Sequence, residues 1–256
     1  MKDLDLAIML ADAADEISLA RFRALDLSIE TKPDRTPVTD ADRAVEAKLR
    51  DLIAHYRPED AVIGEEFANT SSASRSWIID PIDGTANYLR GVPVWASLIA
   101  LRVDGVIVLS VVSAPALGRR WWAERGAGAF TKDVDGSVRL CQVSKVSSLA
   151  DSSISFNSIQ QWDRAGLMPQ LIELTRNIWR DRAYGDFLSY MYVAEGLLEM
   201  ASEHDLKIYD IAALVPIVEE AGGKFSALGS ELTDETSSVL ATNGLMHKTF
   251  QDWFRA

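Results

Sequence analysis

The feature that most constrains the fold is a short apolar run that ends in two closely spaced carboxylates. Trp77 opens the sequence WIIDPIDGT, which places Asp80 and Asp83 at the end of the run. The run is too short for a core helix and rich in β-branched residues, so it predicts a buried strand. Hard cations such as Mg²⁺ bind carboxylates, carbonyl oxygens and water, which a rigid strand end can supply. The next residues, Gly84 and Thr85, favour a helix start, where backbone amides bind phosphate.

The two acids also have an ordinary explanation, since Asp-Pro and Asp-Gly dipeptides are common in surface turns. For the bare pair this is the simpler interpretation. The longer string, with Ile82 between the acids and Gly-Thr after them, is more specific. It resembles the signature of the inositol monophosphatase superfamily, a group of Mg²⁺-dependent phosphatases. Three further stretches resemble the other motifs of that family, in the expected order.

The first of these stretches reads VTDADRAVE and begins at Val38. Thr39 followed by Asp42 predicts a capping box for a helix that runs to about Tyr56. Capping alone is a sufficient role for Asp42. The resemblance implies a second role, in which Asp42 and Thr85 position the attacking water.

The second stretch, AVIGEE from Ala61, predicts a short strand that ends in acids. Two acids after a strand are usually a solvated edge, and Glu66 is given no role. The resemblance implies that Glu65 is a metal ligand with a part in catalysis. Its negative charge suits this, because the site must offset cations.

The third stretch, LKIYDIAA from Leu206, predicts the start of a helix that ends at Gly222. The helix dipole alone favours an acid such as Asp210 in the first turn. The resemblance implies that Asp210 completes a metal site. Tyr209 departs from the tryptophan usual in the family, but this change does not affect the ligand.

Composition and charge restrict the class of protein. The 256 residues suffice for one large domain or two small ones that share a core, and 48% hydrophobic residues argue against disorder. The net charge of −12 disfavours nucleic acid as a partner. An acidic enzyme still binds a phosphate ester when bound metal inverts the local charge.

The sequence predicts a cytoplasmic protein with no membrane segment. Cys141 is the one cysteine, so there is no disulfide framework and no cysteine metal site. The start, MKDLD, has acids where a secretory signal has basic residues. No apolar run reaches membrane-spanning length.

The remaining pattern predicts the other elements. A first helix is expected from an N-cap at Asp3 to about Ala24, and a hairpin is expected where Asp104-Gly105 joins two apolar runs. Further expectations are a strand over 152–156, a helix ending near 174, a loop over 180–186 and a helix over 187–196. A boundary between Cys141 and Ala150 divides the chain into domains 1–145 and 146–256.

The family resemblance implies an α+β fold, a layered α-β-α-β-α sandwich, and a homodimer. Its N-terminal half is mainly antiparallel and its C-terminal half is α/β. The resemblance also implies two or three Mg²⁺ ions per subunit, which Mn²⁺ can replace. The first ion has Glu65, Asp80 and the Ile82 carbonyl as ligands, the second has Asp80, Asp83 and Asp210, a third lies near Glu65, and the amides of Gly84 and Thr85 bind phosphate.

Within the superfamily, local strings such as PVWASL from Pro93 and RAYGD from Arg182 resemble histidinol-phosphate phosphatases of the actinobacterial and plant type. The residues expected to face the substrate beyond its phosphate are Arg182, Gly185, Asp186 and Glu203. Asp186 and Glu203 would pair with the ammonium of histidinol phosphate. Solvated loop acids, or a helix cap at Asp186, are the ordinary alternatives.

Two other functions stay open from the sequence. A phosphatase of the same fold could act on inositol monophosphate or on sugar bisphosphates, whose leaving groups carry no ammonium. A noncatalytic regulatory dimer with a vestigial metal site is a different class. Against it, every expected ligand position holds the right residue type.

Overall fold

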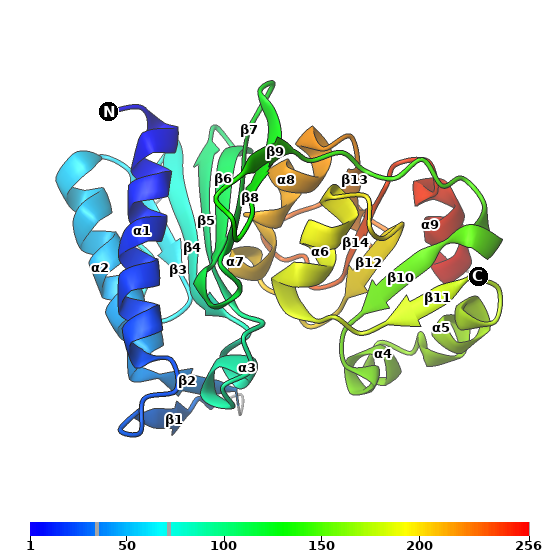
Figure 1. Cartoon of the computed structure of the whole chain (residues 1–256), viewed down its shortest axis with the longest axis horizontal. Coiled ribbons are helices and arrows are strands. Elements are labelled where there is room, and N and C mark those ends of the chain that lie inside the picture. The colour runs from blue at the N-terminus through cyan, green and yellow to red at the C-terminus, as the bar shows by residue number, and fades with distance from the viewer. Residues whose placement is uncertain (34–35, 71–72, 256) are drawn as a thin grey trace.

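The computed structural model describes residues 1–33, 36–70 and 73–255 of the chain. Helices and sheets alternate in five layers along the long axis of the molecule (Figure 1). The layers are a pair of long helices, a seven-stranded sheet, a central helix layer, a five-stranded sheet and a group of outer helices. This arrangement confirms the α-β-α-β-α sandwich expected from the sequence. Among the described residues, no helix is both long and apolar enough to cross a membrane.

The outer pair of helices covers one face of the large sheet. Helix α1 (Asp3–Arg21) and helix α2 (Asp40–Tyr56) bury one face each against its strands (Figure 1). The cap of α1 was predicted wrongly, because Lys2 precedes the helix and Asp3 is its first residue. The helix ends at Arg21, short of the predicted end near Ala24, because Phe22 already has extended backbone.

The large sheet has the strand order β3-β4-β5-β6-β7-β8-β9 and is antiparallel except between β3 and β4. The hairpin predicted at Asp104-Gly105 is confirmed, and it joins β5 to β6. In β4 the register shifts between Asp80, which pairs with Leu98, and Asp83, which pairs with Ala96, so the ladder is irregular between the two acids. The strands are β3 (Ala61–Gly64), β4 (Arg75–Asp83), β5 (Ala96–Val103), β6 (Val106–Ala114), β7 (Arg119–Glu124), β8 (Gly128–Lys132) and β9 (Val138–Leu140).

The small sheet has the order β11-β10-β12-β14-β13, with β10 parallel to both of its neighbours. The loop predicted over 180–186 begins instead with a strand, β11, at the edge of this sheet. The pattern Arg-Asp-Arg gives no strand signal, because an edge strand of three residues is held by backbone pairing alone. The strands are β10 (Ser153–Phe156), β11 (Arg180–Arg182), β12 (Met200–Glu203), β13 (Lys224–Ala227) and β14 (Val239–Thr242).

The central layer consists of α6 (Asp186–Ala194), α7 (Ile208–Ile211) and α8 (Leu214–Glu220). The single helix predicted from 206 to 222 is therefore interrupted. Pro216 lacks the N–H that would bond the Ala212 carbonyl in a continuous helix, so the chain breaks between α7 and α8.

Helices α4, α5 and α9 cover the far side of the small sheet, while α3 and the β1–β2 hairpin lie at one end of the large sheet (Figure 1). The helix predicted to end near 174 is two helices, because Gly166 has a positive φ of 75° between them. These elements are α4 (Ile159–Arg164), α5 (Met168–Thr175), α9 (His247–Arg255), the short α3 (Thr85–Leu89) and the hairpin of β1 (Ile29–Thr31) and β2 (Pro37–Thr39).

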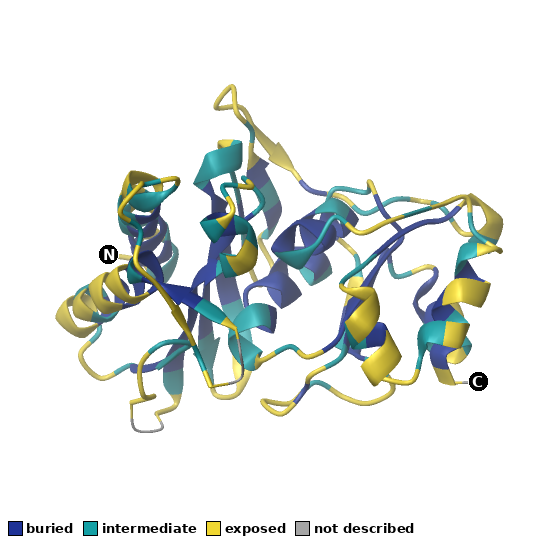
Figure 2. Cartoon of the chain, turned by 90° about the horizontal axis from the view of Figure 1, so that it is seen from below, coloured by how far each residue is buried: buried dark blue, intermediate teal, exposed yellow. Residues whose placement is uncertain are grey.

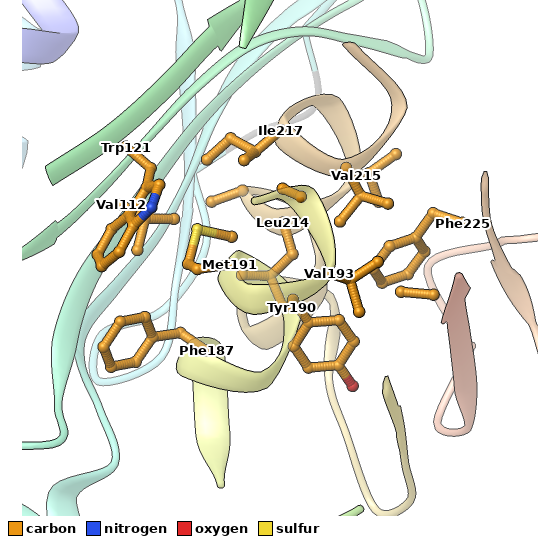
Figure 3. Packing of buried hydrophobic residues seen from close by; sticks show 14 of the residues in the cluster. Val112, Trp121, Phe187, Tyr190, Met191, Val193, Leu214, Val215, Ile217 and Phe225 are labelled. Carbon is orange, nitrogen blue, oxygen red and sulfur yellow. The ribbon is translucent and has the colours of Figure 1, made fainter. Parts of the chain in front are cut away.

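The largest core cluster is shared by both sheets through the central layer. Met191 on α6 and Ile217 on α8 pack toward Trp121 of the large sheet, while Val215 and Phe225 lie on the side of the small sheet (Figure 3). Buried residues run through the strands of both sheets, and the exposed residues gather on the outer helices and loops (Figure 2). Truncating a fully buried side chain of this layer to alanine costs about 2–5 kcal/mol.

Candidate active site

A cavity of about 660 Å³ opens where the end of β4, the starts of α6 and α7, and the end of β10 meet. We call it the main cavity. All predicted site residues line it except Asp42, which is buried in α2, and Arg182. The predicted residues on its wall are Glu65, Asp80, Ile82, Asp83, Gly84, Thr85, Gly185, Asp186, Glu203 and Asp210.

Three carboxylates form a compact group, the acid cluster, made of Asp80, Asp83 and Asp210. One oxygen from each lies within 4.8 Å of the others. Backbone amides fix their orientation: Ile82 N donates to Asp80 at 3.0 Å, Phe187 N to Asp83 at 2.8 Å. The amide of Lys207 donates to Asp210 at 2.6 Å. The sequence motifs are therefore brought together from β4 and α7.

The electrostatics of the acid cluster favour a bound cation. Burial, followed by the charges of Glu65 and Asp83, raises the pKa of Asp80 well above its usual range. Burial likewise raises the pKa of Asp83 and, to about 6, that of Asp210. Crowded carboxylates removed from water need positive charge, and oxygen ligands suit Mg²⁺ or Mn²⁺. The residues present thus fit the metal that the sequence predicted.

Glu65 lies on the same cavity wall but outside the acid cluster. Lys32 Nζ contacts both Glu65 and Glu66 at 2.6 Å, in a partly buried ion pair. Burial raises the pKa of Glu65 to about 7, although the ion pair with Lys32 acts against this shift. Sequence analysis missed Lys32, because no local pattern indicates a partner 33 residues away.

Asp42 is fully buried and joins α2 to the cavity wall. Its Oδ2 accepts from Thr39 N at 2.8 Å and from Thr39 Oγ1 at 2.5 Å, which confirms the predicted capping box. Its Oδ1 accepts from Thr85 Oγ1 at 3.1 Å, and the Thr85 hydroxyl also lies 2.9 Å from the Ile82 carbonyl. Burial raises the pKa of Asp42 above its usual range.

Gly84 makes the sharp turn from β4 into α3. It has a φ of +84° and is the N-cap of α3. A Cβ at this position would lie 3.0 Å from the Val94 carbonyl oxygen and 3.2 Å from Asp186 Oδ2. Only glycine adopts this backbone without strain and leaves room for the neighbouring groups.

Asp186 and Glu203 bring two further carboxylates to the cavity. Asn87 Nδ2 donates to Asp186 Oδ2 at 2.7 Å, and burial raises the pKa of Asp186 to about 6. Glu203 is 3% exposed, and its Oε1 is buried with no hydrogen-bond partner among the described residues. Burial and the charge of Asp186 raise the pKa of Glu203 well above its usual range.

The structure separates Arg182 from the other predicted substrate residues. Gly185 lines the main cavity as the N-cap of α6, with a φ of +83°. Arg182 is exposed, donates to the Asp181 carbonyl and is not part of the cavity wall. Three polar residues that the sequence did not single out as site residues, Asn87, Asn157 and Gln161, contact or line the site.

Comparison with known proteins places the chain among phosphatases. A sequence model of the Inositol monophosphatase family matches residues 2–255. The chain is 55% identical over 247 residues to a histidinol-phosphatase of Mycobacterium tuberculosis, a match that covers 96% of this chain and 95% of the relative. It is 49% identical over 251 residues to a histidinol-phosphatase of Streptomyces coelicolor, with 96% and 94% covered.

A similar solved structure supports the same fold. The crystal structure described as an IMPase/NADP phosphatase complexed with Mg²⁺ and phosphate superposes with a TM-score of 0.84. The two chains are 26% identical, and the match covers 98% of this chain and 94% of the other. The fold predicted from the sequence is confirmed by this likeness.

Proposed function

The chain belongs to the inositol monophosphatase family, and on this premise we propose that it is a Mg²⁺-dependent phosphate monoester hydrolase acting on L-histidinol phosphate. The acid cluster on the wall of the main cavity is the observation that carries the chemistry. The choice of substrate is supported by the two relatives named histidinol-phosphatase, at 55% and 49% identity.

The proposed metal ligands are the carboxylates of Glu65, Asp80, Asp83 and Asp210, with the Ile82 carbonyl oxygen. Asp80 would serve two ions and Asp210 would complete the second, while a third ion would lie near Glu65. Bound Mg²⁺ lowers the pKa of water and offsets the charge of phosphate oxygens. Asp80 is 2% exposed and lies in the acid cluster, and a bound cation would offset this buried negative charge, which supports its role as a ligand.

The chain's own residues would orient the reactants. The Thr85 hydroxyl, held between Asp42 Oδ1 and the Ile82 carbonyl, would position the attacking water and pass its proton toward Asp42. The amides of Gly84 and Thr85, at the turn into α3, would bind oxygens of the phosphate. The positive φ of Gly84 exposes this stretch of backbone to the cavity.

The leaving group would lie against Asp186 and Glu203. A buried carboxylate with an unpartnered oxygen, as in Glu203, gains a charge-assisted hydrogen bond when an ammonium binds. Histidinol phosphate offers an ammonium, whereas inositol phosphate does not. Gly185, at the start of α6, keeps this side of the cavity free of a side chain.

We also propose a cytoplasmic homodimer with domains 1–145 and 146–256. The homodimer follows from the family resemblance. The domain division is supported by the interval between β9, which ends at Leu140, and β10, which begins at Ser153. A cytoplasmic location agrees with Cys141, a single buried thiol outside any disulfide.

The direct test compares kcat/KM for L-histidinol phosphate, inositol 1-phosphate and an aryl phosphate under saturating Mg²⁺. We expect the highest value for histidinol phosphate. A clear preference for inositol phosphate would make the substrate proposal wrong and leave the metal chemistry intact. Absence of phosphate release from all three would instead favour the noncatalytic dimer.

A further inference from the structure

The main cavity has a polar wall that the proposed chemistry does not use. Asn157, just after β10, and Gln161, in α4, both line the cavity, and neither carries a charge. Their side chains are bonded to each other, with Asn157 Nδ2 donating to Gln161 Oε1. The same cavity holds the carboxylates of Asp186 and Glu203, so it offers amides and acids to one bound molecule.

One backbone carbonyl determines the orientation of both amides. Asn157 Nδ2 also donates to the His204 carbonyl oxygen at 3.1 Å, and a carbonyl oxygen only accepts. The nitrogen of Asn157 must therefore face His204 and Gln161. Gln161 then uses its oxygen toward Asn157, which leaves its NH₂ group as the end without a partner among the described residues.

His204, whose backbone carbonyl accepts from Asn157, is itself fixed by its surroundings. His204 is 2% exposed, its Nδ1 lies 2.8 Å from Ser238 Oγ, and its ring packs edge-on against Trp162. Trp162 follows Gln161 directly in α4 and is fully buried. The carbonyl that orients Asn157 is thus firmly placed, and Asn157 in turn holds the Gln161 amide, which does not reorient freely.

We infer that Gln161 is a specificity residue that donates a hydrogen bond to the imidazole ring of the leaving group, with Asn157 as its positioning residue. The inference rests on the proposed function. A neutral imidazole has one nitrogen whose lone pair accepts a hydrogen bond, while an ammonium group has none. A free NH₂ group therefore selects the ring, and the carboxylates of Asp186 and Glu203 select the ammonium.

An apolar side chain completes this wall for a flat ring. Ile159 lies between the two amide residues in sequence, lines the main cavity and is 60% exposed. A ring that covers Ile159 removes apolar surface from water while its nitrogen reaches Gln161. The combination of an aliphatic surface and an oriented donor suits an aromatic heterocycle better than a polyhydroxylated ring.

The test compares two substrates that differ only in the imidazolylmethyl group. O-Phosphoethanolamine has the phosphate, the two-carbon link and the ammonium of histidinol phosphate but lacks the imidazole. We expect Gln161→Met to lower the ratio of kcat/KM for histidinol phosphate over phosphoethanolamine by about three- to tenfold. Gln160→Met is the matched control, because Gln160 is exposed and absent from the cavity wall, and its ratio should equal that of the unmodified enzyme.

A double-mutant cycle tests the positioning role. Asn157→Asp removes the donor, so the Gln161 NH₂ group turns toward the new carboxylate and the ratio falls as it does in Gln161→Met. The double variant should then lose no more than either single variant. Additive losses would show that Asn157 does not act through Gln161.

The outcomes separate this inference from the proposed function. If the unmodified enzyme prefers histidinol phosphate and Gln161→Met keeps its ratio, the ring contact is wrong and the function stands. If the unmodified enzyme prefers inositol phosphate, the function itself is wrong, and the ring contact is wrong with it. Thermal unfolding of each variant verifies that it is folded.

Discussion

Asp42 and Thr85 are 43 residues apart in the chain, yet the Thr85 hydroxyl donates to Asp42 Oδ1 at 3.1 Å. The other carboxylate oxygen of Asp42 caps α2 through Thr39. One buried side chain therefore starts a helix and orients a hydroxyl on the cavity wall. A substitution of Asp42 would therefore change the helix cap and the position of the Thr85 hydroxyl together.

Asp80→Asn should abolish Mg²⁺-dependent activity while the protein stays folded. The substitution keeps the shape of a side chain that is 2% exposed but removes the charge that two ions would share. We expect kcat/KM to fall by about a hundredfold or more. The metal-free variant should be at least as stable as the unmodified protein, because repulsion in the acid cluster is relieved. Near-normal turnover by a folded Asp80→Asn variant would show that Asp80 is not a ligand of a catalytic metal ion.

Metal removal should abolish activity and lower the melting temperature. A ligand that binds only the folded state at a hundred times its Kd adds about 2.7 kcal/mol to the free energy of unfolding. Chelation should therefore lower Tm, and added Mg²⁺ or Mn²⁺ should restore both Tm and turnover. Asp80→Asn is the control and should show a much smaller rise in Tm with Mg²⁺. A chelated sample that keeps full activity contradicts this prediction.

Gly84→Ala should impair activity more than its effect on stability explains. The added Cβ meets the Val94 carbonyl oxygen and Asp186 at a φ of +84°. Gly105→Ala is the matched control, since Gly105 has a φ of +82° and nothing within 4 Å of the new Cβ. Both should lose about 1–2 kcal/mol of stability from backbone strain. Only Gly84→Ala should lower kcat, and an equal kcat in the two variants would argue against the phosphate role.

Asp186→Asn and Glu203→Gln should lower kcat/KM for histidinol phosphate far more than for an aryl phosphate. A charge-assisted hydrogen bond to the ammonium is worth about 1.5–3 kcal/mol, which corresponds to about a tenfold to hundredfold effect. Steady-state kinetics on both substrates measure the difference. Equal losses on the two substrates would assign these acids to support of the metal site or the fold.

His247 should make the protein less stable in acid. It is 2% exposed and hydrogen-bonded to Thr242 and Ser226, and burial, with the nearby Lys224, lowers its pKa to about 4. An unfolded histidine has a pKa of about 6.5, so the unfolded state binds the proton first as the pH falls. The contribution is fully present above pH 6.5 and is lost as the pH falls toward 4.

A comparison with His247→Gln isolates this contribution. Urea unfolding at several pH values should show a penalty for the variant that shrinks by about 2–3 kcal/mol between pH 7.5 and pH 4. A penalty that does not depend on pH would show that His247 stabilises the fold by packing alone.

Local sequence patterns predicted the elements whose signals are contained in a few neighbouring residues. The apolar run before Asp80, the capping box of Thr39 and the turn at Gly105 each depend on such short-range rules, and each is confirmed. The resemblance to a family then supplied the order of the layers, which periodicity alone does not determine.

Features that depend on distant partners were not predictable in this way. Lys32 contacts Glu65 only because the β1–β2 hairpin folds back over the cavity edge. The strand β11 exists because β10 offers a backbone ladder, although its own sequence is polar. The residue roles assigned by resemblance and the domain division stay predictions, as does the role of Arg182, which lies outside the wall of the main cavity.

The central layer has a consequence for any attempt to split the molecule. Helices α6 and α8 bury their side chains against both sheets, and Asp83 of β4 is held by the amide of Phe187 in α6. A cut after residue 145 would leave the N-terminal fragment without the amide that holds Asp83. It would also expose to solvent the apolar faces of α6 and α8 in the C-terminal fragment. Neither fragment alone should be active, but the two fragments should associate when they are mixed. The chain is therefore a natural candidate for a fragment-complementation reporter, in which restored phosphate release signals reassembly.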